Sequence, residues 1–469
     1  MGAGVCGLAA GMLLRRDGHE VTVLERDPEP APGSVEEAWE RWSRDGVAQF
    51  RQPHILLSRG RIVLEQALPD VLGALAAAGA APFDVLDLMP PSVTDRTPSD
   101  GDERFRTITA RRPVLEQVLR CAAEAEPGLE IRTGVGVREL LLSVYDGIPH
   151  VSGVRTESGE AVRADLVIDA MGRRSQLPRW LQAAGTEPVH EEAEDSGFIY
   201  YTRHFRSGNG RLPEFRAPTT TAIGTFSLLT LPGDNHTWSV TVFISAGDRP
   251  LKRLRETELW MKLVAECPLH AHWLDGEPIT GVQAMGGVLD RYRQYCRDGE
   301  PVATGIVPIG DAWACSNPTL GRGMSFGLWH VSYLPEVIRE HLDDPRRFAQ
   351  AWHAATDAEL TPWYRETVEE DRARMAEIEA LRNGLVPEPP TGPSTALLPT
   401  LRAALRHDPD AFRAFAASRF CLTRLSESFA DRGFVERILE LVRDGEPPPL
   451  PGPDRAQLLT LLENAPSAG

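Results

Sequence analysis

Lysine is almost absent from this sequence of 469 residues, in which only Lys252 and Lys262 occur and arginine carries nearly all of the positive charge. Any mechanism that needs a catalytic lysine therefore has two candidates. Positive charge is also outnumbered, since 50 Lys and Arg stand against 67 Asp and Glu for a net charge of −17. A phosphate backbone requires a basic binding face, so this balance argues against nucleic acid as a partner. The acidic balance also disfavours small anionic substrates.

Cysteine and long apolar runs are scarce as well. The six cysteines include no C-x-x-C pair, so neither a zinc site nor a redox dithiol is indicated, and we expect free thiols in the reducing cytoplasm. No apolar run approaches the roughly 18 residues of a membrane span, and we expect no signal peptide. No third ligand accompanies His270 and His272, so no metal site is predicted. The remaining composition is that of a globular protein with about three domain-sized units.

A dinucleotide-binding motif stands at the beginning of the sequence. Gly2, Gly4 and Gly7 form G-x-G-x-x-G, the residues up to Arg16 read as a helix, and a strand follows that ends in Glu25. Glycines allow the tight turn, the approach of the pyrophosphate to the backbone and close packing of helix on strand. The helix N-terminus offers N–H groups to phosphate, and Glu25 can accept hydrogen bonds from ribose hydroxyls. A glycine-rich turn of another α/β protein is the alternative.

The motif lacks the strand that normally precedes it, because only Met1 stands before Gly2. Such a strand would be central in a parallel sheet, and its absence would open a gap with unpaired main-chain groups. We hypothesise that the natural chain carries several more apolar residues before Met1.

Two later segments add to this motif. Residues 164–175 (ADLVIDAMGRRS) read as a buried strand followed by a tight turn at Gly172. Residues 307–327 read as a short strand ending in Gly310-Asp311, a loop containing proline and glycine, and a helix that begins near Gly323. An acid at a strand end, a tight loop and a free helix N-terminus suit an extended polyol-phosphate ligand.

These three segments, in this order, resemble the flavoprotein monooxygenase superfamily that includes para-hydroxybenzoate hydroxylase, flavin epoxidases and flavin halogenases. Within it the sequence looks most similar to bacterial polyether-type epoxidases, through residues 46–56, 112–116 and 195–201. The resemblance covers roughly residues 1–380. It implies an α/β fold with a discontinuous Rossmann-like FAD-binding domain, a β-sheet substrate domain and a C-terminal helical region.

The resemblance also implies the residues that contact FAD. Pyrophosphate, ribose and adenine would be held by Gly2, Gly4, Gly7, Glu25, Arg26 and the backbone of Val135, and Arg51 and Arg112 would approach the phosphates or ribityl chain. Gly310 and Asp311 would meet the ribityl hydroxyls, and the isoalloxazine would be lined by Pro318, Gly321, Gly323, Met324 and Ser325. Arg51 and Arg112 could instead form ordinary surface salt bridges. No catalytic residue is predicted, and Tyr200 and Phe243 are the candidates for substrate contact.

The implied activity is monooxygenation. The backbone N–H groups of Met324 and Ser325 would stabilise an anionic reduced flavin, which reacts with O2 to give a C4a-(hydro)peroxide that hydroxylates or epoxidises an organic substrate of the secondary-metabolite kind. Electrons would come from NAD(P)H, either directly or through a separate flavin reductase. Direct use is in doubt because Met171 precedes Gly172, where classical hydroxylases of this superfamily carry an aspartate.

Two other functions stay open. The first is a different FAD-dependent oxidoreductase on the same scaffold, a double-bond reductase or a halogenase, although the halogenase needs a catalytic lysine and a W-x-W-x-x-P motif that the sequence lacks. The second is a non-catalytic flavoprotein.

The predicted domains are interleaved along the chain. Residues 1–60, 105–180 and 295–335 form the FAD-binding domain, and residues 61–104 and 181–294 form the substrate domain. Residues 336–469 form the helical region, with a Pro-rich linker near 386–399. The C-terminal part is a candidate cap over the active site or a dimerisation element.

Overall fold

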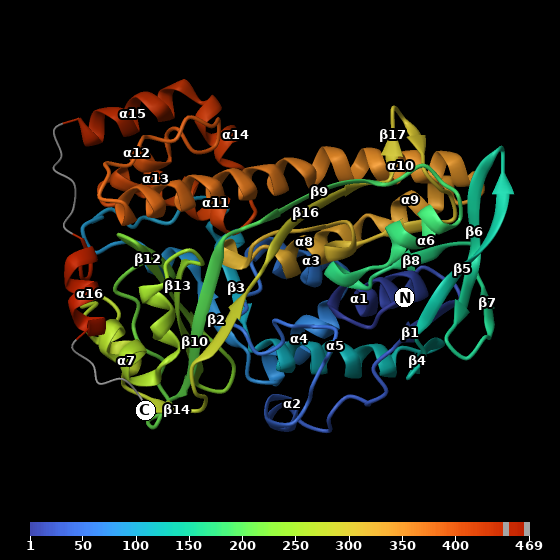
Figure 1. Cartoon of the computed structure of the whole chain (residues 1–469), viewed down its shortest axis with the longest axis horizontal. Helices are drawn as coiled ribbons and strands as arrows, with labels where there is room; N and C mark the ends of the chain where they lie inside the picture. Colours follow the sequence, from blue (N-terminus) through green and yellow to red (C-terminus); the bar gives the residue numbers. More distant parts are fainter. Residues whose placement is uncertain (444–449, 464–469) are drawn as a thin grey trace.

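The computed structural model describes residues 1–443 and 450–463. Parts of the predicted C-terminal region, residues 444–449 and 464–469, lie outside the described residues. Figure 1 shows an elongated molecule. The nucleotide-binding fold and the β5–β6–β7 sheet lie toward one end, and a second sheet with the last helices lies at the other.

The N-terminal motif folds as the sequence predicts, because apolar side chains fill the inner face of its helix and glycines bring that helix onto the sheet. At Gly11 an added Cβ would stand 3.1 Å from the Val23 side chain, which is a tight contact, so glycine favours the close approach of helix and strand. The nucleotide-binding fold consists of α1 (Val5–Arg16), β1 (Val21–Glu25), α5 (Arg112–Ala125), β4 (Leu129–Thr133), β5 (Val137–Tyr145), β6 (Ile148–Thr156), β7 (Ala161–Arg163), β8 (Val167–Asp169), β19 (Ile306–Pro308) and α8 (Gly323–Ser332).

The parallel strands form two pairs, β1 with β4 and β8 with β19. Met1 and Gly2 lie between the pairs. Gly2 N donates to Leu24 O (2.7 Å), Met1 N donates to Ile168 O (2.7 Å), and Ala170 N donates to Met1 O (2.9 Å). These three hydrogen bonds join β1 to β8 at the position where the sequence analysis expects a further central strand.

The second sheet is antiparallel and follows the order β11-β12-β13-β10-β14. Every residue of β13 is buried, because one face meets the cavity described below and the other is covered by α7 and α16. Its elements are β10 (Phe198–Arg206), β11 (Thr220–Ile223), β12 (Phe226–Pro232), β13 (Thr237–Ser245), α7 (Thr257–Ala265), β14 (Glu277–Pro278), β15 (Gln283–Gly286) and α16 (Arg455–Glu463). Two long strands, β9 (His190–Asp195) and β16 (Leu289–Gln294), run between the two ends of the molecule (Figure 1).

Residues 61–104 divide between the two units. The helices α3 (Ser58–Ala67) and α4 (Pro69–Ala77) pack against α8 and α5 of the nucleotide-binding fold. The residues from Val85 to Ser92 instead line the cavity. The smaller elements are α2 (Val35–Glu40), β2 (Ala81–Asp84), β3 (Arg106–Thr109), α6 (Leu177–Ala183), β17 (Cys296–Arg297), β18 (Glu300–Pro301) and β20 (Ala314–Cys315).

The C-terminal region is helical throughout the described part, apart from its connecting segments. Its helices are α9 (Leu334–His341), α10 (Pro345–Glu359), α11 (Thr361–Arg382), α12 (Leu398–Ala404), α13 (Pro409–Arg419), α14 (Leu425–Ala430) and α15 (Arg432–Val442). The described residues 383–397, around the predicted linker, carry no helix or strand. Helices α12 to α15 share one hydrophobic core with α1, α5 and α8. No helix in residues 1–443 or 450–463 is long and apolar enough to cross a membrane.

Candidate active site

A single cavity of about 1510 Å³ runs from the start of α1 to the face of the second sheet. A pocket for one small ligand usually measures about 300–1,000 Å³, so this cavity has room for two. Its walls come from the nucleotide-binding fold, from β10, β12 and β13, and from α11, α12 and α13. Helices α12 and α13 therefore form part of the cavity wall, and the role of the C-terminal part as a cap stays a prediction.

The glycines of the first motif divide into those that open the cavity and those that hold the backbone. Gly4 lines the cavity at the N-cap of α1, and an added Cβ there would meet nothing within 4 Å. Gly2 has φ +96°, a conformation that favours glycine, and a Cβ on Gly7 would lie 1.9 Å from Gly2 O. No side chain caps α1, so its N-terminus is available to an anion in the cavity.

Glu25 lies at the end of β1 within a buried network of charges. Its Oε2 accepts hydrogen bonds from Ala3 N (2.7 Å) and Arg44 Nη2 (2.8 Å), and its Oε1 accepts from Asp27 N (2.9 Å). Arg44 also pairs with Asp27 (2.8 Å) and with Glu116 (3.1 Å). One buried guanidinium thus holds three carboxylates beside the start of α1. Arg44 could not be predicted from the sequence, because no motif marks a residue whose partners are 17 to 72 positions away.

The arginines predicted to approach FAD do not all reach the cavity. Arg26 and Arg112 line it, as does Val135, whose N–H donates to Glu25 O (2.8 Å). Arg51 is not among the lining residues. Its guanidinium donates to the carbonyls of Trp39 and Trp42 and lies over the Trp39 ring.

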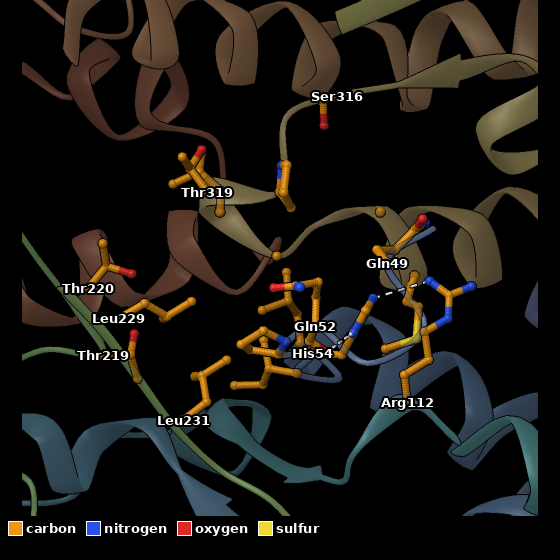
Figure 2. A pocket seen from close by; sticks show the side chains of 18 of the residues that line it. Gln49, Gln52, His54, Arg112, Thr219, Thr220, Leu229, Leu231, Ser316 and Thr319 are labelled. Atoms are coloured by element: carbon orange, nitrogen blue, oxygen red, sulfur yellow. Dashed lines mark hydrogen bonds between the residues drawn. The ribbon is translucent and has the colours of Figure 1, made fainter. Parts of the chain in front are cut away.

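His54 lies in the middle of the cavity, between Arg112 and the second sheet (Figure 2). Burial and the Arg112 charge lower the pKa of His54 to about 3, so the ring is neutral. Arginine can only donate, so Nε2 accepts from Arg112 Nη1 (3.1 Å) and Nδ1–H donates to Gln52 O (2.8 Å). Arg112 also donates to Glu116 Oε1 (2.6 Å), which fixes its direction.

The residues predicted to meet the ribityl chain and the isoalloxazine lie on one loop before α8. Asp311, Pro318, Gly321, Gly323 and Met324 line the cavity. Within the described residues, no side-chain hydrogen bond involves the Asp311 carboxylate, so it is available to ligand hydroxyls.

Gly310 and Ser325 lie next to this loop but do not line the cavity. A Cβ on Gly310, which has φ +55°, would lie 2.8 Å from Cys6 Sγ. Ser325 Oγ accepts a hydrogen bond from Leu57 N (3.0 Å), so its side chain binds the backbone of another segment. The N–H group of Ser325 itself lies in the first turn of α8.

The wall opposite this loop is the second sheet. Tyr200 and Phe243 stack with ring centroids 5.5 Å apart and line the cavity. Leu229, Leu231 and Thr219 lie on the same side, and Ser316 and Thr319 face them from the loop (Figure 2). The wall is largely apolar, which suits an organic ligand.

A buried acid joins the loop to α11. Asp371 Oδ1 accepts from Thr319 Oγ1 (2.5 Å), whereas Asp371 Oδ2 has no partner within the described part of the chain. Desolvation raises the pKa of Asp371 to about 8, with Asp290 and Glu370 adding to the rise. Asp371 is therefore protonated at neutral pH and can donate a hydrogen bond into the cavity. It was not predicted, because a single acid on an acidic helix gives no sequence signal.

Asp371→Asn is expected to stabilise the protein increasingly as the pH rises from about 4 to about 8. With a folded-state pKa of about 8 against 3.8, the folded state keeps the proton after the unfolded chain has lost it, so stability falls as pH rises between these values. Asparagine removes that loss. We expect a gain on the order of 2 kcal/mol at high pH, near pH 8.5, and little change near pH 4.

Thermal denaturation at both pH values measures this difference, with exposed Asp100→Asn as the control. An equal effect of Asp371→Asn at both pH values would contradict the assignment.

Comparison with known proteins shows which folds this chain resembles. Residues 1–45 match the NAD(P)-binding Rossmann-like domain family. Protein Rv3254 of Mycobacterium tuberculosis (strain ATCC 25618 / H37Rv) is 29% identical over 360 residues, which cover 72% of each chain. PqsL of Pseudomonas aeruginosa, described as a probable FAD-dependent monooxygenase, is 16% identical with a TM-score of 0.56, over 81% of this chain and 95% of PqsL. The flavin-dependent brominase Bmp2 is 16% identical with a TM-score of 0.56, over 94% of this chain and 98% of Bmp2.

The chain thus has the fold of the flavin-dependent oxidoreductases. The shared architecture consists of a Rossmann-like domain, a second sheet and a helical C-terminal region. The predicted fold class is confirmed, and this likeness of fold agrees with the predicted superfamily and enzyme class. The likeness to polyether-type epoxidases stays a prediction.

Proposed function

We propose that this chain binds FAD and uses it, with O2 and electrons from NAD(P)H, to hydroxylate or epoxidise an organic substrate. The observation that carries the proposal is the continuity of the cavity. Gly4 at the start of α1 and Tyr200 on the second sheet line the same space, with Asp311 and the Pro318–Gly323 loop between them.

The lining residues fit an extended dinucleotide. Gly4 leaves room for a pyrophosphate at the uncapped end of α1, and Glu25 stands where a ribose would lie. Asp311 offers a free carboxylate to the ribityl hydroxyls. Gly323 and Met324 place the N-terminus of α8 against the isoalloxazine, where its dipole stabilises negative charge by about 0.5–2 kcal/mol.

Bound FAD would supply the storage of two electrons and the activation of oxygen. The chain's own residues do the rest. The apolar sheet face and the capping helices keep water from the reacting atoms, and the Tyr200–Phe243 pair offers a flat surface for an unsaturated or aromatic substrate.

The segment 164–175 favours a separate flavin reductase as the electron source. Asp169, the nearest acid to Gly172, is fully buried and accepts hydrogen bonds from Met171 N (3.0 Å) and from Ser175 Oγ. It is not among the residues that line the cavity, so it cannot take the place of the aspartate that Met171 replaces. Direct reduction by NAD(P)H stays the alternative.

A halogenase is disfavoured by the position of both lysines. Lys252 and Lys262 lie on the far side of the second sheet, in the segment 250–255 and in α7, and neither lines the cavity.

Absorbance spectra of the purified protein test the proposal. We expect stoichiometric FAD whose absorbance is bleached under anaerobic photoreduction and restored by O2. NADPH alone is expected to be slow, and a flavin reductase added with NADH should support continuous O2 consumption. Failure to retain or rebind FAD would overturn the proposal. Rapid bleaching by NADPH alone would show that no reductase is needed.

A further inference from the structure

The end of the cavity formed by α11, α12 and α13 differs from the rest in its charge. Six charged side chains line it: Glu370, Asp371, Arg374, Arg402, Arg406 and Arg419. Asp371 is protonated at neutral pH, so four guanidinium groups face one carboxylate. This excess stands out in a chain with a net charge of −17.

Two of these arginines form hydrogen bonds or ion pairs within the protein. Arg374 donates to Gly224 O (2.9 Å), Phe226 O (2.8 Å) and Glu377 (2.8 Å). Arg419 Nη2 pairs with Glu370 Oε2 (2.5 Å), but Arg419 Nη1 is buried and has no partner within the described residues.

Arg402 and Arg406 have no structural partner in the described residues, and Arg402 is the one that lies within α12. It forms no hydrogen bond or ion pair with any residue in 1–443 or 450–463. Its helix neighbours Leu401 and Ala404 are fully buried, whereas Arg402 is exposed, and the exposed surface faces the cavity. Desolvation lowers the pKa of Arg402 to about 10, and the Arg419 charge adds to this, so the guanidinium remains charged at neutral pH.

A guanidinium at the wall of a cavity, without a partner in the protein, is available to pair with an anionic ligand. The walls around it are apolar and aromatic, with Leu405, Phe412, Phe415 and Phe420. A carboxylate on an aromatic or apolar skeleton satisfies both features, because its two oxygens match the planar fork of an arginine.

We propose that Arg402, assisted by Arg419, binds the carboxylate of an organic acid substrate. The inference deepens the proposed function, on which it rests. It places the anionic end of the substrate against the C-terminal helices and its apolar part toward Tyr200 and the Pro318–Gly321 loop. It also reverses the expectation, drawn from the net charge, that anionic substrates are disfavoured. The charge of the cavity wall, and not the net charge of the chain, determines which substrates bind.

Calorimetric titration of the FAD-loaded protein with 2-naphthoate and 2-naphthamide tests the proposal. The two probes differ in charge and hardly in shape. We expect naphthoate to bind about 10–100-fold more tightly, the effect of one charge-assisted hydrogen-bonded pair. Arg402→Gln should abolish the preference, Arg402→Lys should keep part of it, and exposed Arg347→Gln should keep all of it.

The melting temperature without ligand separates binding from folding. Because Arg402 has no structural partner, Arg402→Gln should melt at the same temperature as the unmodified chain or higher. A lower melting temperature with an unchanged preference would make Arg402 structural and overturn the proposal. Equal affinity for both probes, or binding of neither at its solubility limit, would overturn it too.

The flavin spectrum of the same sample distinguishes this failure from failure of the proposed function. Retained FAD without a preference for naphthoate defeats only the carboxylate site. If the protein never binds FAD but still prefers naphthoate in a way that depends on Arg402, only the proposed oxidoreductase function is contradicted.

Discussion

Gly4→Val is expected to abolish tight FAD binding while leaving the protein folded. Gly4 has φ −81° and ψ −175°, which valine adopts readily, and no protein atom lies within 4 Å of the new Cβ. The side chain therefore projects only into the cavity, where the pyrophosphate would approach α1. We expect the affinity for FAD to fall by at least about 100-fold, whereas the loss of the glycine N-cap costs about 1 kcal/mol of stability.

Fluorescence titration of the apoprotein with FAD measures the affinity, and circular dichroism monitors the fold. Gly73→Val is the matched control, because Gly73 lies exposed in α4 and also has no atom within 4 Å of an added Cβ. FAD affinity that survives Gly4→Val would show that the pyrophosphate does not lie at α1. Gly7 is unsuitable for this test, since its Cβ would collide with Gly2 O and disturb the fold itself.

Arg44→Met is expected to cause the largest loss of stability of any single change proposed. Arg44 is the shared partner of Glu25, Asp27 and Glu116, whose side chains are 9%, 16% and 0% exposed. Without the guanidinium, three carboxylates repel one another with little access to water. Removing one partner of a buried ion pair costs about 3–5 kcal/mol, and we expect a loss of at least that size.

Urea denaturation followed by circular dichroism gives the free energy of unfolding. Arg347→Met is the control, because that side chain is 77% exposed, and a change within about 0.5 kcal/mol is expected. A loss of less than about 1 kcal/mol for Arg44→Met would mean that the carboxylates find other partners or water. FAD affinity should fall along with stability, since Arg44 orients Glu25.

The local elements of the nucleotide-binding fold could be predicted because short-range patterns encode them. The spacing of Gly2, Gly4 and Gly7, followed by a helix and an acid-terminated strand, appears in the structure as α1 and β1. The Gly310-Asp311 turn and the start of α8 at Gly323 were predicted from similarly local signals. Arg51 could not be placed, because whether its guanidinium points to a ligand or to the carbonyls of Trp39 and Trp42 depends on tertiary packing.

The sequence alone determined the dinucleotide-type fold of the N-terminal segment and the positions of its glycines and its acid, because backbone conformation and the periodicity of apolar residues act over a few positions. The tertiary structure alone decided which charges meet. Arg44 reaches Glu116 across 72 positions, and Arg402 comes to face a cavity whose other wall is formed some 200 positions earlier. Desolvation then sets the protonation of Asp371 and His54, and burial is a property of the packed molecule that no segment carries by itself.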